Sequence, residues 1–134
     1  MLKISDRQIL SFRDTRITPV LGKLIVAVRN TAPPGVAGWS EDLLAARVRF
    51  ACLRGLGLGA ATDVALEPYV ILMMEFGPRF DLHPAIKPIL EDRTTAFEDR
   101  IDLLFDQLPQ HVWAELEILS GEAAWDAVEE TTDA

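Results

Sequence analysis

One run of apolar residues, YVILMM at positions 69–74, constrains this chain more than any other feature. A helix that is apolar on every side has no face for water, so this segment must be buried all round. The dipeptide Gly77-Pro78 follows shortly afterwards and is a strong signal for the end of a helix. The pattern therefore predicts a central buried helix that ends in a sharp corner.

Length and composition indicate one globular domain that needs no disulfide. The chain has 134 residues, of which 49% are apolar and 25% are charged, and this is enough for a core of its own. Its single cysteine, Cys52, cannot form an internal disulfide, which fits a reducing cytoplasm. The first ten residues lack the apolar core of a signal peptide, and no apolar run is long enough to span a bilayer. We expect a single cytoplasmic domain over residues 1–134 without membrane insertion.

The charges are distributed unevenly between the two halves of the chain. Residues 1–60 carry a net charge of +5 and residues 61–134 carry −13, which gives −8 for the whole chain. An acidic C-terminal half repels nucleic acid and suits a basic protein partner. The alternative is that these acids only keep the protein soluble.

Two helices are predicted before residue 60. Ser5 to Gln8 match a capping box, and an apolar stripe with helical spacing continues to about Asn30, with Pro19 as a kink or a new start: Ile17, Val20, Leu21, Leu24 and Val28. The Pro- and Gly-rich segment 32–38 should be an irregular loop. Ser40 then caps a second helix whose buried face includes Cys52. On that helix we expect Arg47 and Arg54 to reach solvent.

The sequence GLGLG at positions 55–59 invites comparison with a nucleotide-binding loop. Such a loop follows a strand and has the spacing GxGxxG, whereas here a helical pattern precedes the glycines and the third glycine comes one residue early. We interpret the glycines as the end of a helix and a loop.

The central helix should begin at Thr62-Asp63 and either kink or restart at Pro68. A short helix limited by Pro88 is expected over Ala85 to Glu91. Thr95 and Glu98 match a second capping box.

An amphipathic stripe follows Thr95, formed by Phe97, Ile101, Leu104, Phe105 and Leu108. The last long helix should start at Pro109, and four apolar residues should face inward from it: Val112, Trp113, Leu116 and Leu119. The acidic segment 122–134 should end in frayed residues, with Trp125 docked on the body. The chain as a whole is predicted to be all-α, an irregular bundle of five to six helices around a central buried helix.

No catalytic, cofactor or metal site is legible in the sequence. Cys52 lies on an apolar helical face, where a cysteine packs as a small hydrophobe. The two histidines, His83 and His111, belong to no Cys/His cluster. The helically spaced carboxylates Glu98, Asp99 and Asp102 fall on the polar side of their helix, where pairing with Arg100 at the surface explains them.

The corner after the central helix is the best candidate for contact with a partner. An arginine flanked by two aromatics is a typical composition for an interface hot spot, and we assign tentative partner binding to five residues: Glu75, Phe76, Arg79, Phe80 and Asp81. The alternative is structural, with Arg79 and Asp81 tied to the exposed carbonyls of the helix end.

At this corner the chain resembles a family of small bacterial helical proteins whose genes lie near type VI secretion effector and PAAR-type spike genes. The matching positions are a helix start at residues 62–64, the segment 72–81 with its Phe-Gly and Phe-Asp pairs, Pro84, and the segments 89–92 and 100–104. The resemblance implies an accessory protein of a secreted effector, either a chaperone or adaptor or an immunity protein. It carries over no catalytic residue.

We therefore expect a non-enzymatic, cytoplasmic protein that binds a secreted effector or its loading machinery and needs no cofactor. Two other functions stay open, a small helical enzyme with an unrecognised site and a structural subunit. A concave pocket that holds perturbed carboxylates would favour the enzyme, and an exposed apolar patch beside the acidic half would favour the binding protein.

Overall fold

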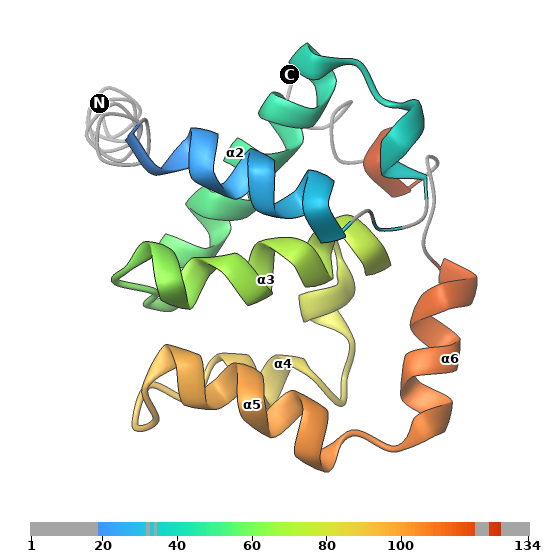
Figure 1. The fold of residues 1–134 in the computed structure, drawn as a ribbon. Helices are drawn as coiled ribbons and strands as arrows, with labels where there is room; N and C mark the ends of the chain where they lie inside the picture. The colour runs from blue at the N-terminus through green and yellow to red at the C-terminus, as the bar shows by residue number, and fades with distance from the viewer. Residues whose placement is uncertain (1–18, 32, 34, 120–123, 127–134) are drawn as a thin grey trace, which may run out of the picture.

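The apolar run lies in helix α3, Asp63–Phe76, at the centre of the molecule. The computed structural model describes residues 19–31, 33, 35–119 and 124–126. In Figure 1 α3 runs across the middle, with the helix formed by residues 19–31 on one side of it and α4 and α5 on the other. Contacts join α3 to α2, α5, α6 and the turn η2. Leu72 is 4% exposed and Ile71 is partly buried, so the predicted burial of residues 69–74 is confirmed for every residue except Ile71.

Helix α3 begins and ends at the predicted signals but does not restart at Pro68. The hydroxyl of Thr62 accepts a hydrogen bond from the Ala65 amide at 3.1 Å, and Gly77, with φ of 98°, ends the helix. Pro68 lies inside the continuous helix. A proline at this position removes the amide that would bond the carbonyl of Val64, and Val64 is 77% exposed. The helical hydrogen bond that Pro68 removes therefore lies on the solvent-facing side of α3, where water can replace it.

Helix α2, Glu41–Leu58, crosses α3 at a very short distance. Ser40 caps it as predicted, and its hydroxyl accepts a hydrogen bond from Leu43 at 3.1 Å. A Cβ added to Gly55 would lie 2.6 Å from a methyl carbon of Leu66 and 3.2 Å from the ring of Tyr69. Gly55 therefore permits the close approach of the two helices, and Gly59, with φ of 114°, ends α2. The interpretation of GLGLG as a helix end is confirmed.

The helix over residues 19–31 packs on both α2 and α3. Leu24 and Val28 from the predicted stripe are buried in the core. Lys23 pairs with Asp63 at 3.7 Å in the first turn of α3, and Arg29 pairs with Glu41 in the first turn of α2. The Ser5 capping box, Ile17 and the part of the stripe before Pro19 lie outside the described residues.

Shorter elements complete the fold. They are η1 (Val36–Gly38), η2 (Phe80–Leu82), α4 (Lys87–Leu90), α5 (Phe97–Gln107) and α6 (Gln110–Leu119), with a further helical turn at 124–126. The expected irregular loop thus contains the single turn η1, and the helix expected over Ala85 to Glu91 is reduced to four residues, with Pro88 in its first turn. The described residues form no strand, so the fold is all-α. No helix among them is long and apolar enough to cross a membrane.

The second predicted capping box is wrong, because the Thr95 hydroxyl donates to the carboxylate of Asp92 at 3.3 Å and α5 begins one residue later than predicted. Ala96 stands at the N-cap of α5 without a side-chain hydrogen bond. Arg100 is buried and donates to three carbonyl oxygens, those of Thr95 at 2.7 Å, Leu58 at 2.6 Å and Leu90 at 2.9 Å. This one side chain ties the end of α2, the end of α4 and the loop before α5 together. The expected surface pairing of Arg100 is therefore also wrong.

Arg47 was expected to reach solvent, but it is buried. Its guanidinium lies 4.4 Å from the ring centre of Trp39 and 5.0 Å from that of Trp125. The two indole rings contact each other edge to face, with centroids 5.9 Å apart, and the guanidinium packs against both, where cation–π attraction replaces part of its hydration. This contact joins the helical turn 124–126 to α2, and the predicted docking of Trp125 is confirmed.

One residue of the stripe on α5 points the wrong way. Phe97, Ile101 and Leu104 are buried as predicted, but Phe105 is 59% exposed. Helix α6 turns away after Pro109, and Trp113 from α6 stacks on the Phe105 ring at 5.6 Å. From α6, Val112 and Leu116 are buried and Trp113 is half-buried. The side chain of Leu119 lies outside the described residues.

We expect Leu72→Ala to lower the free energy of unfolding by about 2–5 kcal/mol, because the change removes buried methyl groups and leaves a cavity in the centre of the core. The matched control is Val64→Ala on the same helix, which removes an exposed side chain and should change stability by less than about 0.5 kcal/mol. Urea unfolding of both variants provides the measurement. Equal stabilities for the two variants would show that α3 is not central.

Candidate functional site

The corner after α3 is built on two aromatic rings that point inward. Gly77 and Pro78 turn the chain from α3 into η2, and Phe76 and Phe80 on either side of this turn are both buried. The Phe80 ring packs on Tyr69 at 5.6 Å between centroids, and the Phe76 ring packs on Trp113 at 5.3 Å. The two rings that flank Arg79 in sequence therefore anchor the corner to the core and leave Arg79 between them at the surface.

Asp81 is buried beneath this corner and is fully paired. It is 4% exposed, and its carboxylate accepts a hydrogen bond from Arg54 at 2.7 Å and another from the Tyr69 hydroxyl at 2.7 Å. A carboxylate taken out of water needs such charge-assisted partners. Arg54 was expected to reach solvent, but it is half-buried and committed to this pair. We call these three residues the Asp81 triad.

Burial raises the pKa of Tyr69 well above its ordinary value, and the neighbouring Asp81 carboxylate raises this pKa further. Both effects disfavour a phenolate. The Tyr69 hydroxyl therefore stays protonated at every physiological pH and remains the donor to Asp81.

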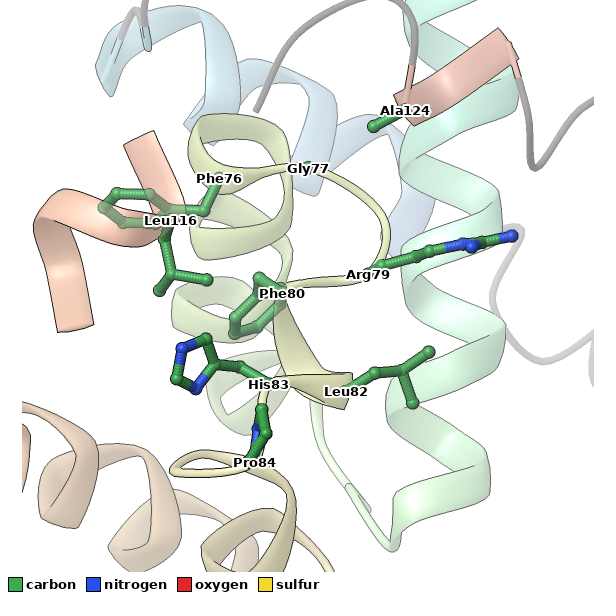
Figure 2. A pocket seen from close by; sticks show the side chains of 9 residues that line it. All are labelled: Phe76, Gly77, Arg79, Phe80, Leu82, His83, Pro84, Leu116 and Ala124. Atoms are coloured by element: carbon green, nitrogen blue, oxygen red, sulfur yellow. The ribbon is translucent and has the colours of Figure 1, made fainter. Parts of the chain in front are cut away.

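Arg79 and Glu75 remain for contact with another molecule. Arg79 is exposed and Glu75 is half-buried. Within the part of the chain that the structure describes, neither side chain forms an ion pair or hydrogen bond, so the alternative in which Arg79 ties down the helix end is not what the structure shows. In Figure 2 the Arg79 side chain extends away from the rings of Phe80 and His83.

A pocket of about 360 Å³ opens beside the corner, and we call it the corner pocket. Phe76 comes from α3 and Leu116 from α6, and Phe80 and His83 come from η2 and the residue after it (Figure 2). The lining is mostly apolar and consists of Phe76, Gly77, Arg79, Phe80, Leu82, His83, Pro84, Leu116 and Ala124. Leu82 is 46% exposed, so part of this apolar side chain of the lining is accessible to another molecule.

His83 is fixed in one tautomer at the edge of the pocket. Its Nδ1 accepts a hydrogen bond from the Ala85 amide at 3.0 Å, so the ring proton of the neutral imidazole lies on Nε2. Nε2 is 2.9 Å from a carboxylate oxygen of Glu115 and donates to it. The pair links the corner to α6 and so holds the two walls of the pocket at a fixed spacing.

Sequence reasoning found one wall of this pocket and missed the other. Three of the five predicted partner-binding residues, Phe76, Arg79 and Phe80, line the pocket, whereas Asp81 belongs to the triad below it and Glu75 lies outside the lining. Leu82 and His83 directly follow the predicted segment and could have been included. Leu116 comes from a helix more than thirty residues away, and no local signal places it there.

The other chemical candidates do not form a site with the corner. Cys52 is buried in the core, as predicted, and burial raises the pKa of its thiol to about 12. The carboxylates of Glu98, Asp99 and Asp102 are exposed on α5. Among the described residues, no three His, Cys, Asp or Glu side chains are grouped so that they could hold a metal ion.

Comparisons with known proteins add no family to this geometry. The chain matches no family model, no curated protein and no solved structure. A function must therefore be argued from the corner pocket, the charges and the exposed side chains themselves.

We expect Tyr69→Phe to lower the free energy of unfolding by about 1.5–3 kcal/mol, because it removes a buried hydrogen bond to a charged acceptor and leaves one oxygen of Asp81 without its donor. Urea denaturation measures the loss. In the Asp81→Asn background the same change should cost clearly less, because the charged acceptor is already gone. Equal losses in both backgrounds would mean that the hydroxyl and the carboxylate do not interact.

The Cys52 thiol should be unreactive in the folded protein. At about pH 8 an exposed thiol with an ordinary pKa of about 8.5 forms enough thiolate to react quickly with an aromatic disulfide reagent. Cys52 is buried with a raised pKa, so we expect labelling only after urea is added. Complete labelling of the native protein within the mixing time would contradict this burial and make Cys52 a candidate nucleophile.

Proposed function

We propose that this protein is a non-enzymatic binding protein that receives apolar side chains of a protein partner in the corner pocket. The observation that carries the proposal is an open, largely apolar pocket whose walls are fixed from behind by packed aromatic rings and by the His83–Glu115 pair. Preformed pockets of this kind bind without a large cost of ordering, and protein interfaces concentrate their binding energy in such places.

Arg79 suits the polar rim of this interface. Exposed arginines at the edge of an apolar pocket are frequent hot spots because the guanidinium can pair with carboxylates and stack on aromatic rings of a partner. Arg79 makes no internal hydrogen bond or ion pair within the described residues, so binding would break no existing pair of its side chain.

The resemblance to proteins encoded beside type VI secretion effector and PAAR-type spike genes supports the identity of the partner. On this proposal the partner is a secreted effector or its loading machinery, and the two proteins meet in the cytoplasm. Two roles fit such a partner, a chaperone or adaptor that keeps the effector ready for loading and an immunity protein that neutralises it.

Co-expression with the effector encoded at the same locus separates these two roles. If the protein is a chaperone, the soluble yield of the effector rises when the two are co-expressed and falls when the chaperone is absent. If it is an immunity protein, it restores the growth of cells that the effector would otherwise kill. Cross-linking in the source organism followed by mass spectrometry identifies the partner if it is encoded elsewhere. An isolated protein that captures no protein and instead carries a small molecule in the pocket would contradict the proposal.

Leu82→Glu places a charge at the mouth of the corner pocket, and we expect it to weaken binding of the identified partner by about 2 kcal/mol or more without a large change in melting temperature, because Leu82 is already half exposed. Arg79→Ala should weaken binding by a similar amount. Titration calorimetry beside a thermal melt measures both effects. Lys87→Ala serves as the control, since Lys87 is exposed on α4 and does not line the pocket. Normal binding by both pocket variants would exclude the pocket from the interface.

A further inference from the structure

A second surface lies on the outer side of α5 and α6 and ends in an exposed aromatic ring. Trp113 contacts two other rings. Its centroid lies 5.3 Å from that of Phe76 and 5.6 Å from that of Phe105. Phe76 belongs to the core, whereas Phe105 is 59% exposed. The three rings therefore form a ladder from the core to solvent, and we call its outer part, Phe105 with Trp113, the aromatic step.

The geometry of the aromatic step fixes the outer ring firmly. The Phe105 and Trp113 rings are nearly parallel, with 16° between their planes. Trp113 is in turn fixed by Phe76, so the exposed ring is held by contacts and has little freedom left to lose on binding. A rigid aromatic side chain that remains largely in water is a typical anchor of a protein interface.

The exposed charged residues that α5 and α6 themselves carry are all acidic. Helix α5 carries four exposed carboxylates, Glu98, Asp99, Asp102 and Asp106, and its one arginine is Arg100, which points inward to three carbonyls. Asp102 and Glu98 precede Phe105 by three and seven residues, so they share its side of the helix. Helix α6 contains no lysine or arginine, and its Glu115 is already paired with His83, so the carboxylates that concern the step are those of α5. A basic segment is the complementary occupant.

The protein itself contains one arginine that packs on aromatic rings, although that ring pair is perpendicular and the rings of the step are nearly parallel. Trp39 and Trp125 hold the Arg47 guanidinium at 4.4 and 5.0 Å from their ring centres. A guanidinium stacks on aromatic faces and also forms forked hydrogen bonds with carboxylates, while a lysine ammonium does the second only as a point charge. Flat exposed rings bordered by carboxylates therefore select arginine over lysine.

We infer that the aromatic step is a docking site for an arginine-bearing basic segment of a protein partner. An arginine of this segment stacks on the exposed face of Phe105 and pairs with the carboxylates that precede it on α5. Phe105, Trp113 and the carboxylates of α5 do not line the corner pocket, and only Phe76 connects the two surfaces. The aromatic step can therefore bind its partner whether or not the corner pocket is occupied.

The direct test uses a short fluorescein-labelled peptide that alternates arginine with leucine, and two matched peptides in which lysine or glutamate replaces arginine. Fluorescence anisotropy is measured with the full chain at about 25 mM and about 150 mM salt, since screening weakens exposed charge pairs. We expect the arginine peptide to bind most tightly, the lysine peptide about threefold or more weaker, and the glutamate peptide not at all.

The decisive variant is Phe105→Ala, which should weaken binding of the arginine peptide about tenfold and leave the melting temperature nearly unchanged, because the ring is exposed. Phe105→Leu keeps apolar bulk without the ring and should remove the preference for arginine over lysine. Asp102→Asn should lower the affinity and the salt dependence together. Val64→Ala, which shortens an exposed apolar side chain on α3, should change the affinity by less than about twofold.

Three outcomes would overturn the inference. Equal affinity of Phe105→Ala and the unaltered protein would mean that charge alone attracts the peptide. Equal affinity for the arginine and lysine peptides would show that a guanidinium does not stack on Phe105. A dimer of the unaltered protein that Phe105→Ala dissociates, seen by analytical ultracentrifugation, would make the step a contact between two copies of this chain. Failure of Leu82→Glu and Arg79→Ala to affect a partner would leave this result untouched, because those variants report on the corner pocket.

Discussion

The pairing of Asp81 with Arg54 and Tyr69 is the interaction on which the functional corner depends. A carboxylate in the interior is costly unless charged and hydrogen-bonding partners replace the water it loses. The Asp81 carboxylate has both: the Arg54 guanidinium from α2 and the Tyr69 hydroxyl from α3 each donate to one of its oxygens at 2.7 Å. Because these donors come from two helices, the turn after α3 can have only one position relative to both. The rings of Phe76 and Phe80 and the exposed Arg79 take their places from that position.

Two further arginines hold the bundle together through different chemistry. Arg100 satisfies three carbonyl oxygens at the ends of helices and in a loop, where the backbone otherwise lacks partners. Arg47 packs against two indole rings that contact each other, and it joins the helical turn 124–126 to α2. In each case a charged side chain bridges elements that also contribute buried apolar residues, such as Trp125 and Leu90. The irregular helices of this protein are thus connected by a few specific polar contacts in addition to their common core.

These buried cations also shape the outer surface. Since Arg100 points inward, α5 presents its carboxylates without an exposed basic residue of its own, and Phe105 of the aromatic step lies on the same helix. Phe76 both lines the corner pocket and contacts Trp113 of the aromatic step. One core residue therefore supports two separate surfaces of different character, one apolar and concave, the other aromatic and acidic.

The sequence by itself determined the all-α fold, the central burial of residues 69–74, and the helix boundaries at Ser40, Thr62 and Gly77, because these features follow from local hydrogen bonding and from the absence of any polar face. It also indicated the corner that forms one wall of the pocket. Tertiary packing decided the rest. Arg47, Arg54 and Arg100 look like surface residues in a helical pattern, and only rings, a carboxylate and carbonyls from distant segments make their burial favourable. Phe105 fits the apolar stripe, yet it faces solvent because α6 turns away and leaves Trp113 as its neighbour. Leu116 completes the pocket from α6, and a pattern of local spacing carries no information about which distant helix lies opposite.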